Sequence, residues 1–104
     1  MKRTEIKELF KSFENLKEQK VSVSGWIRNI RISKSFGFIE INDGSFFKTV
    51  QIVIDDTMPN FAEVSKYNVG SAICAEGSVI VTPSAPQPFE IKAENVALIG
   101  AAPP

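Results

Sequence analysis

The sequence contains no histidine and a single cysteine, Cys74. The absence of histidine excludes serine–histidine and cysteine–histidine nucleophile pairs, histidine acid–base catalysis and most zinc sites. A lone cysteine cannot close an intramolecular disulfide, and its strand-like flanks, SAICAEG, favour a small packed side chain over a nucleophile. Neither a P-loop nor a dinucleotide-binding fingerprint is present. These absences make an independent enzyme hard to build from this chain.

Long apolar runs are also missing. No stretch approaches the length needed to span a bilayer, and residues 1–20 are too charged for a signal peptide, so we expect a cytoplasmic protein with no membrane partner. The 104 residues are enough for one domain with one core. The adjacent carboxylates Asp55 and Asp56 precede TMPN, which is typical of a turn rather than of a glycosidase or metal site.

The formal net charge is zero, but the charges are unevenly distributed. Residues 1–34 contain nine of the 12 Lys and Arg residues, whereas residues 35–104 contain eight of the 12 Asp and Glu residues. The chain therefore has a basic end and an acidic end. A local basic patch can attract phosphate groups although the whole molecule is neutral.

Residues 4–17, TEIKELFKSFENLK, have the apolar spacing of an amphipathic helix. Thr4 is expected to cap its start, and Glu5 and Glu8 suit the positive end of the helix dipole. The polar face carries glutamate as well as lysine, which favours packing on the domain over a membrane surface. The apolar face consists of Ile6, Leu9, Phe10, Phe13 and Leu16.

From residue 21 the apolar period changes to two, which is typical of strands. Gly25 and Gly77 interrupt the first and fourth segments. We predict bends there, with the side-chain parity of the first strand shifting at Gly25. A connector with a short helix near Pro59 joins the third and fourth segments, and three prolines make TPSAPQP a loop. The five predicted strands cover residues 21–32, 37–41, 48–55, 70–81 and 89–99.

Five strands with bends, and a helix-containing connector between the third and fourth, predict a mainly β fold: the five-stranded Greek-key OB-fold barrel with an N-terminal helix. An SH3-like barrel would lack a connector of this length at that place. We divide the chain into an N-terminal helical extension at residues 1–20, the OB-fold domain at 21–99 and a linker at 100–104.

Strand alternation assigns the side chains of the first three strands to two faces. A consistent register places all their isoleucines inside and leaves aromatic side chains beside arginine on the solvent face, which favours a binding surface. The alternative is that Phe36 or Phe38 packs beneath the N-terminal helix and that Gln51 is an ordinary solvated residue. The predicted outer face carries Arg31, Phe38 and Gln51, with Asn29, Phe36 and Glu40 near them.

Such a face suits single-stranded nucleic acid. A base can stack on Phe38, which is worth roughly 1–3 kcal/mol. Arg31 can hold a phosphate or a base acceptor, and the Gln51 carboxamide has the donor and acceptor needed to recognise the edge of a pyrimidine. Arg28 is either a phosphate contact or a solvated charge. The loops SKS and TPSAPQP flank this face in an OB-fold.

The other aromatic residues of this region are given structural roles. Trp26 is assigned to the core. Phe46 and Phe47, which follow NDGS, are expected to anchor the turn between the second and third strands. Three lysines are expected to raise the local positive potential: Lys34, Lys48 and Lys92.

The ordered segments VSVSGWIRNIR, GFIEINDGS, VQIVID and GSVIVTPSAPQPFEIKAENVALIG resemble the anticodon-binding domain of class IIb aminoacyl-tRNA synthetases, and most of all the asparaginyl-tRNA synthetases. By position, the resemblance implies that Phe38 stacks on the middle anticodon uridine and that Gln51 hydrogen-bonds it, with Arg31 alongside. It implies that Glu90 lies near the first anticodon base. Arg28 is a weaker match.

The resemblance also implies a parent enzyme that joins asparagine to its tRNA with ATP and magnesium and forms a homodimer through its catalytic domain. The motifs of that domain are not among these 104 residues, and GAAPP lies where the hinge to it would begin. We therefore expect this chain to bind tRNA anticodon loops weakly, to need no cofactor and to catalyse nothing. The alternatives are an aspartyl-tRNA synthetase domain, a free-standing single-strand-binding OB protein, or a purely structural OB domain.

Overall fold

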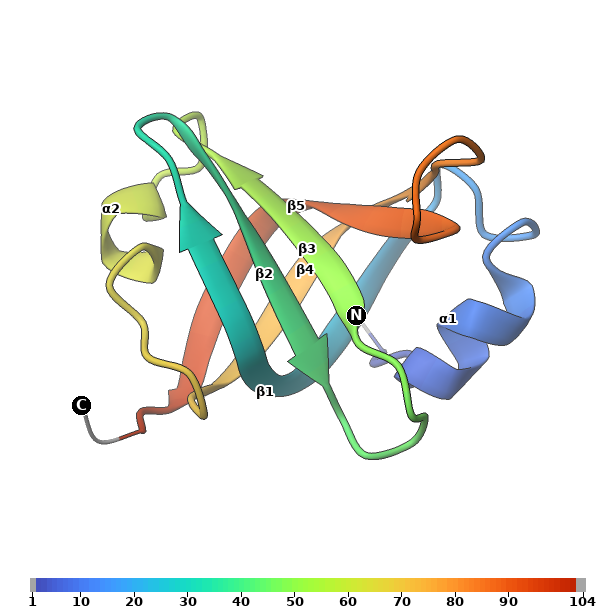
Figure 1. Ribbon diagram of the computed structural model, residues 1–104, viewed down its shortest axis with the longest axis horizontal. Helices are drawn as coiled ribbons and strands as arrows, with labels where there is room; N and C mark the ends of the chain where they lie inside the picture. The colour runs from blue at the N-terminus through green and yellow to red at the C-terminus, as the bar shows by residue number, and fades with distance from the viewer. Residues whose placement is uncertain (1, 103–104) are drawn as a thin grey trace.

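A computed structural model describes residues 2–102 (Figure 1). Its five strands form one closed barrel in the order β1-β2-β3-β5-β4, which confirms the predicted OB-fold. Helix α1 lies at one end of the barrel and the short helix α2 lies at the other (Figure 1). The elements are α1 (Ile6–Ser12), β1 (Lys20–Ile32), β2 (Phe36–Asn42), β3 (Val50–Asp55), α2 (Phe61–Val64), β4 (Ala72–Val81) and β5 (Phe89–Gly100).

The barrel closes because β1 and β4 are long enough to pair on both sides. The first half of β1, residues 20–26, pairs with β4, and its second half, residues 26–32, pairs with β2. Strand β5 pairs antiparallel with β4 and parallel with β3. A barrel closed in this way leaves no unpaired sheet edge along most of its strands.

Gly77, the site of a predicted bend, lies opposite a bulge of β5: Glu76 pairs with Asn95 and Gly77 pairs with Ala93, so Glu94 is the extra residue. The β4–β5 register shifts between Glu76 and Gly77, and a Cβ atom on Gly77 would lie 2.1 Å from the carbonyl oxygen of Lys92. Gly25 is also a point of close approach, because a Cβ atom there would lie 2.7 Å from the carbonyl oxygen of Asn42. Both strands therefore bend where another backbone comes too near for a side chain.

The predicted parity shift at Gly25 is wrong. The β1–β2 register shifts between Ile27 and Asn29, so Arg28 is the extra residue of the bulge. Gly25 allows the close crossing, but the alternation of side chains continues past it to the buried Ile27.

This displacement of the bulge explains why the core assignment of Trp26 is wrong. Since Ile27 points inward, its neighbour Trp26 must point outward, and 52% of Trp26 is exposed. Its side chain lines a hollow of about 290 Å³ together with Ser24, Gly25 and Ile99.

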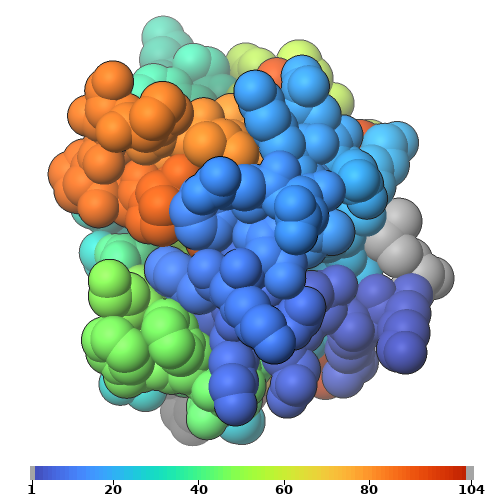
Figure 2. Space-filling view, turned by 90° about the vertical axis from the view of Figure 1, so that its right-hand side faces the viewer, coloured from blue at the N-terminus to red at the C-terminus, as the bar shows by residue number. Residues whose placement is uncertain are grey.

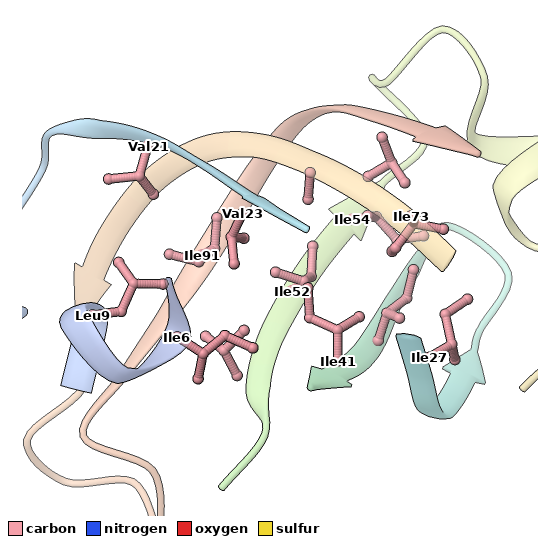
Figure 3. Packing of buried hydrophobic residues seen from close by; sticks show 14 of the residues in the cluster. Ile6, Leu9, Val21, Val23, Ile27, Ile41, Ile52, Ile54, Ile73 and Ile91 are labelled. Carbon is pink, nitrogen blue, oxygen red and sulfur yellow. The ribbon is translucent and has the colours of Figure 1, made fainter. Parts of the chain in front are cut away.

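The barrel interior is filled mainly by β-branched side chains. Figure 3 shows Ile27, Ile41 and Ile52 pointing into it from β1, β2 and β3. Each fully buried isoleucine contributes about 1.5–3 kcal/mol of transfer free energy. The prediction that all isoleucines of the first three strands are inside is wrong for Ile32, which is 37% exposed. It lies at the end of β1, beyond the pairing with β4, and its Cδ1 covers the bare backbone of Gly37.

Helix α1 closes one end of the barrel with the predicted apolar face. Ile6 and Leu9 are fully buried, while Phe10, Phe13 and Leu16 are partly buried against the core. The helix is shorter than the predicted 4–17 and ends at Ser12, ahead of a turn in which Glu18 adopts a positive φ of 63°.

The predicted cap of α1 by Thr4 is wrong. The Thr4 N–H donates to the carbonyl oxygen of Ser22 at 2.7 Å, so Thr4 is held against β1. The cap comes from the turn after β2. Asp43 Oδ2 accepts from the Ile6 N–H at 2.9 Å, and Ser45 Oγ accepts from the Lys7 N–H at 3.0 Å. The unpaired N–H groups of the helix start are thus satisfied by a distant segment.

The turn after β3 and the segment after β2 follow the predictions in part. Asp55 Oδ1 accepts from the Thr57 N–H at 3.0 Å, which confirms that the carboxylate pair belongs to a turn. Phe46 anchors its segment as predicted, with its ring centroid 5.0 Å from that of Phe10. The same prediction is wrong for Phe47, which is 81% exposed and contacts the Phe46 ring, with their centroids 4.6 Å apart, without packing against the core.

Two predictions concern the ends of the chain and its environment. The predicted linker at 100–104 falls partly on residues 103 and 104, which lie outside the described residues, and the last strand includes Gly100. Between residues 2 and 102, no helix is long and apolar enough to cross a membrane.

Candidate nucleic-acid interface

The predicted site residues lie on one wall of the barrel, formed by the outer faces of β1, β2, β3 and β5. Residues paired directly across neighbouring strands point to the same side of a sheet. The strand registers arrange this wall in two rows. The polar row is Asn29, Glu40, Gln51 and Glu90, and the aromatic row is Arg31, Phe38, Val53 and Lys92.

Phe38 is the centre of the aromatic row and is held by its neighbours. The Arg31 guanidinium carbon lies over the ring, 5.9 Å from its centroid. The Phe36 ring meets it edge to face, with the centroids 5.6 Å apart and an interplanar angle of 82°. Phe38 is half-buried and Phe36 is 43% exposed. The Phe38 ring therefore lies on the outer wall, where its contacts with Arg31 and Phe36 hold its orientation. The alternative of Phe38 packing beneath the N-terminal helix is excluded.

Hydrogen bonds connect the polar row. Glu40 Oε2 accepts from Asn29 Nδ2 at 2.9 Å, and Glu40 Oε1 accepts from Thr49 Oγ1 at 3.1 Å. Gln51 Nε2 donates to Glu90 Oε1 at 3.4 Å. Among residues 2–102, no hydrogen bond to Gln51 Oε1 is found, so this acceptor faces solvent without a partner in the chain.

Unpaired positive charges surround the wall. Within the described part of the chain the single ion pair joins Lys20 and Glu94, and it involves none of the residues of the two rows. Arg28, Arg31 and Lys34 are exposed and form no ion pair there. Guanidinium and ammonium groups in this state can bind phosphate oxygens.

Loops border the wall at both sides. The turn at 33–35 connects β1 and β2, and the loop at 82–88 connects β4 and β5 (Figure 1). The second loop is held closed, because Thr82 Oγ1 donates to the Gln87 carbonyl oxygen at 2.7 Å and the Thr82 N–H donates to the Pro88 carbonyl oxygen at 2.9 Å. Figure 2 shows this loop beside α1.

Strand periodicity predicted most of the residues of this wall but not the hydrogen bonds between them. It placed Arg31, Phe38 and Gln51 on one face, and the structure brings all three together with Asn29. It did not show that Glu90 contacts Gln51, since that depends on the parallel pairing of β3 with β5 across a long stretch of chain. Nothing in the local sequence signals which distant strand completes a barrel wall.

This chain is a closed five-stranded barrel whose solvent-exposed wall carries an aromatic ring, carboxamides and unpaired cations. These features define an OB-fold domain of the oligonucleotide-binding class. The tRNA anti-codon family, described as an OB-fold nucleic acid binding domain, matches residues 21–99, and the chain belongs to this family.

Similar proteins are asparagine–tRNA ligases, which confirms the resemblance found in the sequence. The chain is 55% identical over 95 residues to the ligase of Clostridium acetobutylicum and 55% identical over 100 residues to that of Bacillus cytotoxicus. These matches cover 91% and 96% of this chain but 20% and 22% of the two ligases. The chain therefore spans about a fifth of the length of the curated relatives it matches.

Solved structures share the fold. Asparaginyl-tRNA synthetase from Pyrococcus horikoshii, complexed with asparaginyl-adenylate, superposes with a TM-score of 0.83 at 23% identity, covering 98% of this chain and 23% of that one. Aspartyl-tRNA synthetase from Entamoeba histolytica gives 0.81 at 22% identity, covering 98% and 22%. At such identities these likenesses support the fold alone.

Proposed function

We propose that this domain binds the anticodon loop of an asparagine tRNA and that its outer wall recognises the middle uridine. The observation that carries the proposal is the grouping of Phe38, Arg31 and Gln51 on one wall, with the ring outward and the carboxamide oxygen unpartnered. The family of the chain and its similarity to asparagine–tRNA ligases support the same partner.

Each residue of the wall has a part in this proposal. The middle base stacks on Phe38, which contributes roughly 1–3 kcal/mol whatever the base. Arg31, already over the ring, binds the adjoining phosphate or a base oxygen. Gln51 distinguishes the base, because uracil offers an N3–H donor whereas the unprotonated N3 of cytosine is an acceptor.

The neighbouring bases lie along the polar row. Glu90, at its β5 end, accepts hydrogen bonds from the N1–H and amino group of a guanine at the first anticodon position. Asn29, at the β1 end, lies on the other side of Gln51 and is available to the third base. Arg28, on the bulge, contacts phosphate. In this proposal three consecutive bases lie along the polar row in the order Glu90, Gln51 and Asn29, with Glu40 between the last two residues.

We further propose that the domain is part of a longer cytoplasmic, homodimeric ligase that joins asparagine to its tRNA and uses ATP and magnesium outside this segment. The similarity to whole ligases supports this assignment. Among residues 2–102, no three His, Cys, Asp or Glu side chains form a group that could hold a metal ion.

The proposal is tested by titrating the chain at low salt with anticodon stem-loops. A GUU loop should bind more tightly than a GCU loop, and Gln51→Ala should reduce this difference more than it reduces overall affinity. Equal affinities for the two loops indicate a free-standing single-strand binder. No detectable binding, under conditions where phosphate contacts are strongest, indicates a structural domain. Tighter binding of GUC than of GUU indicates an aspartyl-tRNA synthetase domain.

A further inference from the structure

We propose that Glu90 is a positioning residue for Gln51, so that recognition of the middle base depends on a carboxylate on the neighbouring strand. This inference rests on the proposed function. It gives Glu90 a second task beside its contact with the first base, and it couples recognition of the two bases.

The contact arises from the barrel topology. Strands β3 and β5 run parallel, with Ile52 opposite Ile91, which brings the preceding residues Gln51 and Glu90 together on the outer wall. Gln51 Nε2 donates to Glu90 Oε1 at 3.4 Å, and both side chains are half-buried. A carboxylate accepts hydrogen bonds and does not donate them. The amide nitrogen of Gln51, not its oxygen, must therefore face Glu90.

The other neighbour of Gln51 is already occupied. Glu40 lies directly opposite Gln51 on β2, but its Oε2 accepts from Asn29 and its Oε1 accepts from Thr49. Each oxygen of Glu40 thus already accepts one hydrogen bond, and among residues 2–102 the Gln51 amide donates to Glu90 and not to Glu40. Glu90 sets the orientation, and Gln51 Oε1 is left free toward solvent.

This orientation decides which base fits. A free amide oxygen accepts a hydrogen bond from the N3–H of uracil, whereas cytosine presents a lone pair at N3 and opposes the oxygen with a second acceptor. Without Glu90 the Gln51 amide can rotate by half a turn and present its nitrogen, which suits cytosine. Removing Glu90 should therefore relax the choice of middle base even though Glu90 does not contact that base.

The test uses anticodon stem-loops with an abasic first anticodon position, so that Glu90 has no base of its own to contact. The measured quantity is the ratio of affinities for uridine and cytidine in the middle. We expect a ratio of at least about tenfold for the unaltered chain and within about threefold for Glu90→Ala. Glu90→Gln should give an intermediate ratio, because a carboxamide at position 90 can present either its oxygen or its NH2 group to Gln51 and therefore fixes the Gln51 amide less firmly than a carboxylate does. Glu94→Ala, which removes the same charge from an exposed site on the same strand, should not change it.

A double-mutant comparison separates positioning from a general loss of affinity. In a Gln51→Ala background, Glu90→Ala should produce no further change in the ratio. Melting temperatures identify variants that do not fold, and Glu90→Met, of similar length without an acceptor, replaces Glu90→Ala if it unfolds.

The outcomes distinguish this inference from the proposed function. If Glu90→Ala keeps the ratio of the unaltered chain on the abasic loops, Glu90 does not position Gln51, although the proposed function stands. A uridine-to-cytidine ratio that disappears in the unaltered chain when the first base is absent also overturns the inference. In that case the guanine, and not the Glu90 carboxylate, orients the Gln51 amide. Equal binding of GUU and GCU loops by the unaltered chain overturns the proposed function itself.

Discussion

The carboxylate of Asp43 caps a helix that lies far from it in the sequence: its Oδ2 accepts a hydrogen bond from the N–H of Ile6, 37 residues earlier, at 2.9 Å. Ser45 in the same turn accepts from the Lys7 N–H. Its hydroxyl and N–H in turn donate to Asp43 Oδ1 at 2.6 and 2.9 Å. This turn therefore fastens helix α1 to the barrel at the edge of the β2–β3 connection.

Asp43→Ala should lower the free energy of unfolding by about 1 kcal/mol, the usual effect of losing a helix cap. Urea denaturation at neutral pH measures the change. Asp56→Ala, which removes the same charge from an exposed residue that caps no helix, is the matched control and should change stability by less than about 0.5 kcal/mol. Equal effects of the two substitutions would show that the cap is not stabilising.

The same contact predicts a pH dependence. Burial raises the pKa of Asp43, but the hydrogen bonds from the Ser45 hydroxyl and from the Ile6 and Ser45 N–H groups outweigh it, so the pKa lies below its ordinary value of 3.8. A carboxyl group with a lowered pKa stabilises the fold above its unfolded-state pKa and loses that effect as the pH falls through the folded value. The stability gap between the unaltered chain and Asp43→Ala should be complete above about pH 5 and shrink below pH 3.8. A gap that grows on acidification would contradict this.

Asp43 also shows what the sequence could and could not predict. Local capping rules pointed to Thr4, because they consider only the residues beside a helix, and the actual cap depends on a turn that the fold brings to it. Alternation placed β2 and β3 correctly because those strands are regular. In β1 the expected shift is at Gly25, because glycine is typical of bends, whereas the bulge lies at Arg28, and this difference placed Trp26 in the core.

The close approach of β5 to Gly77, opposite the bulge at Glu94, gives a second prediction of stability. A Cβ atom there would lie 2.1 Å from the Lys92 carbonyl oxygen and 2.7 Å from the Ala93 Cα, and both are backbone atoms that cannot move aside alone. Gly77→Ala should lower the free energy of unfolding by about 1–3 kcal/mol, as overpacking does. Gly100→Ala is the control, because nothing lies within 4 Å of its Cβ position. Urea denaturation of the two variants should separate them clearly, and a neutral Gly77→Ala would mean that β4 and β5 can move apart at the bulge.

The outward-facing, half-buried ring of Phe38 supports the proposed function most directly, and its removal separates binding from folding. Phe38→Ala should weaken binding of a GUU stem-loop by about 5- to 150-fold, the equivalent of roughly 1–3 kcal/mol of stacking. Phe38→Tyr keeps a ring and should keep most of the affinity. Phe47→Ala removes an equally large ring that is 81% exposed and belongs to neither row of the wall, so its affinity should stay within about twofold. Unfolding of Phe38→Ala, seen as a lost thermal transition, would instead make the ring a part of the core. Equal losses of affinity in Phe38→Ala and Phe47→Ala would mean that RNA binds through scattered aromatic contacts and not on this wall.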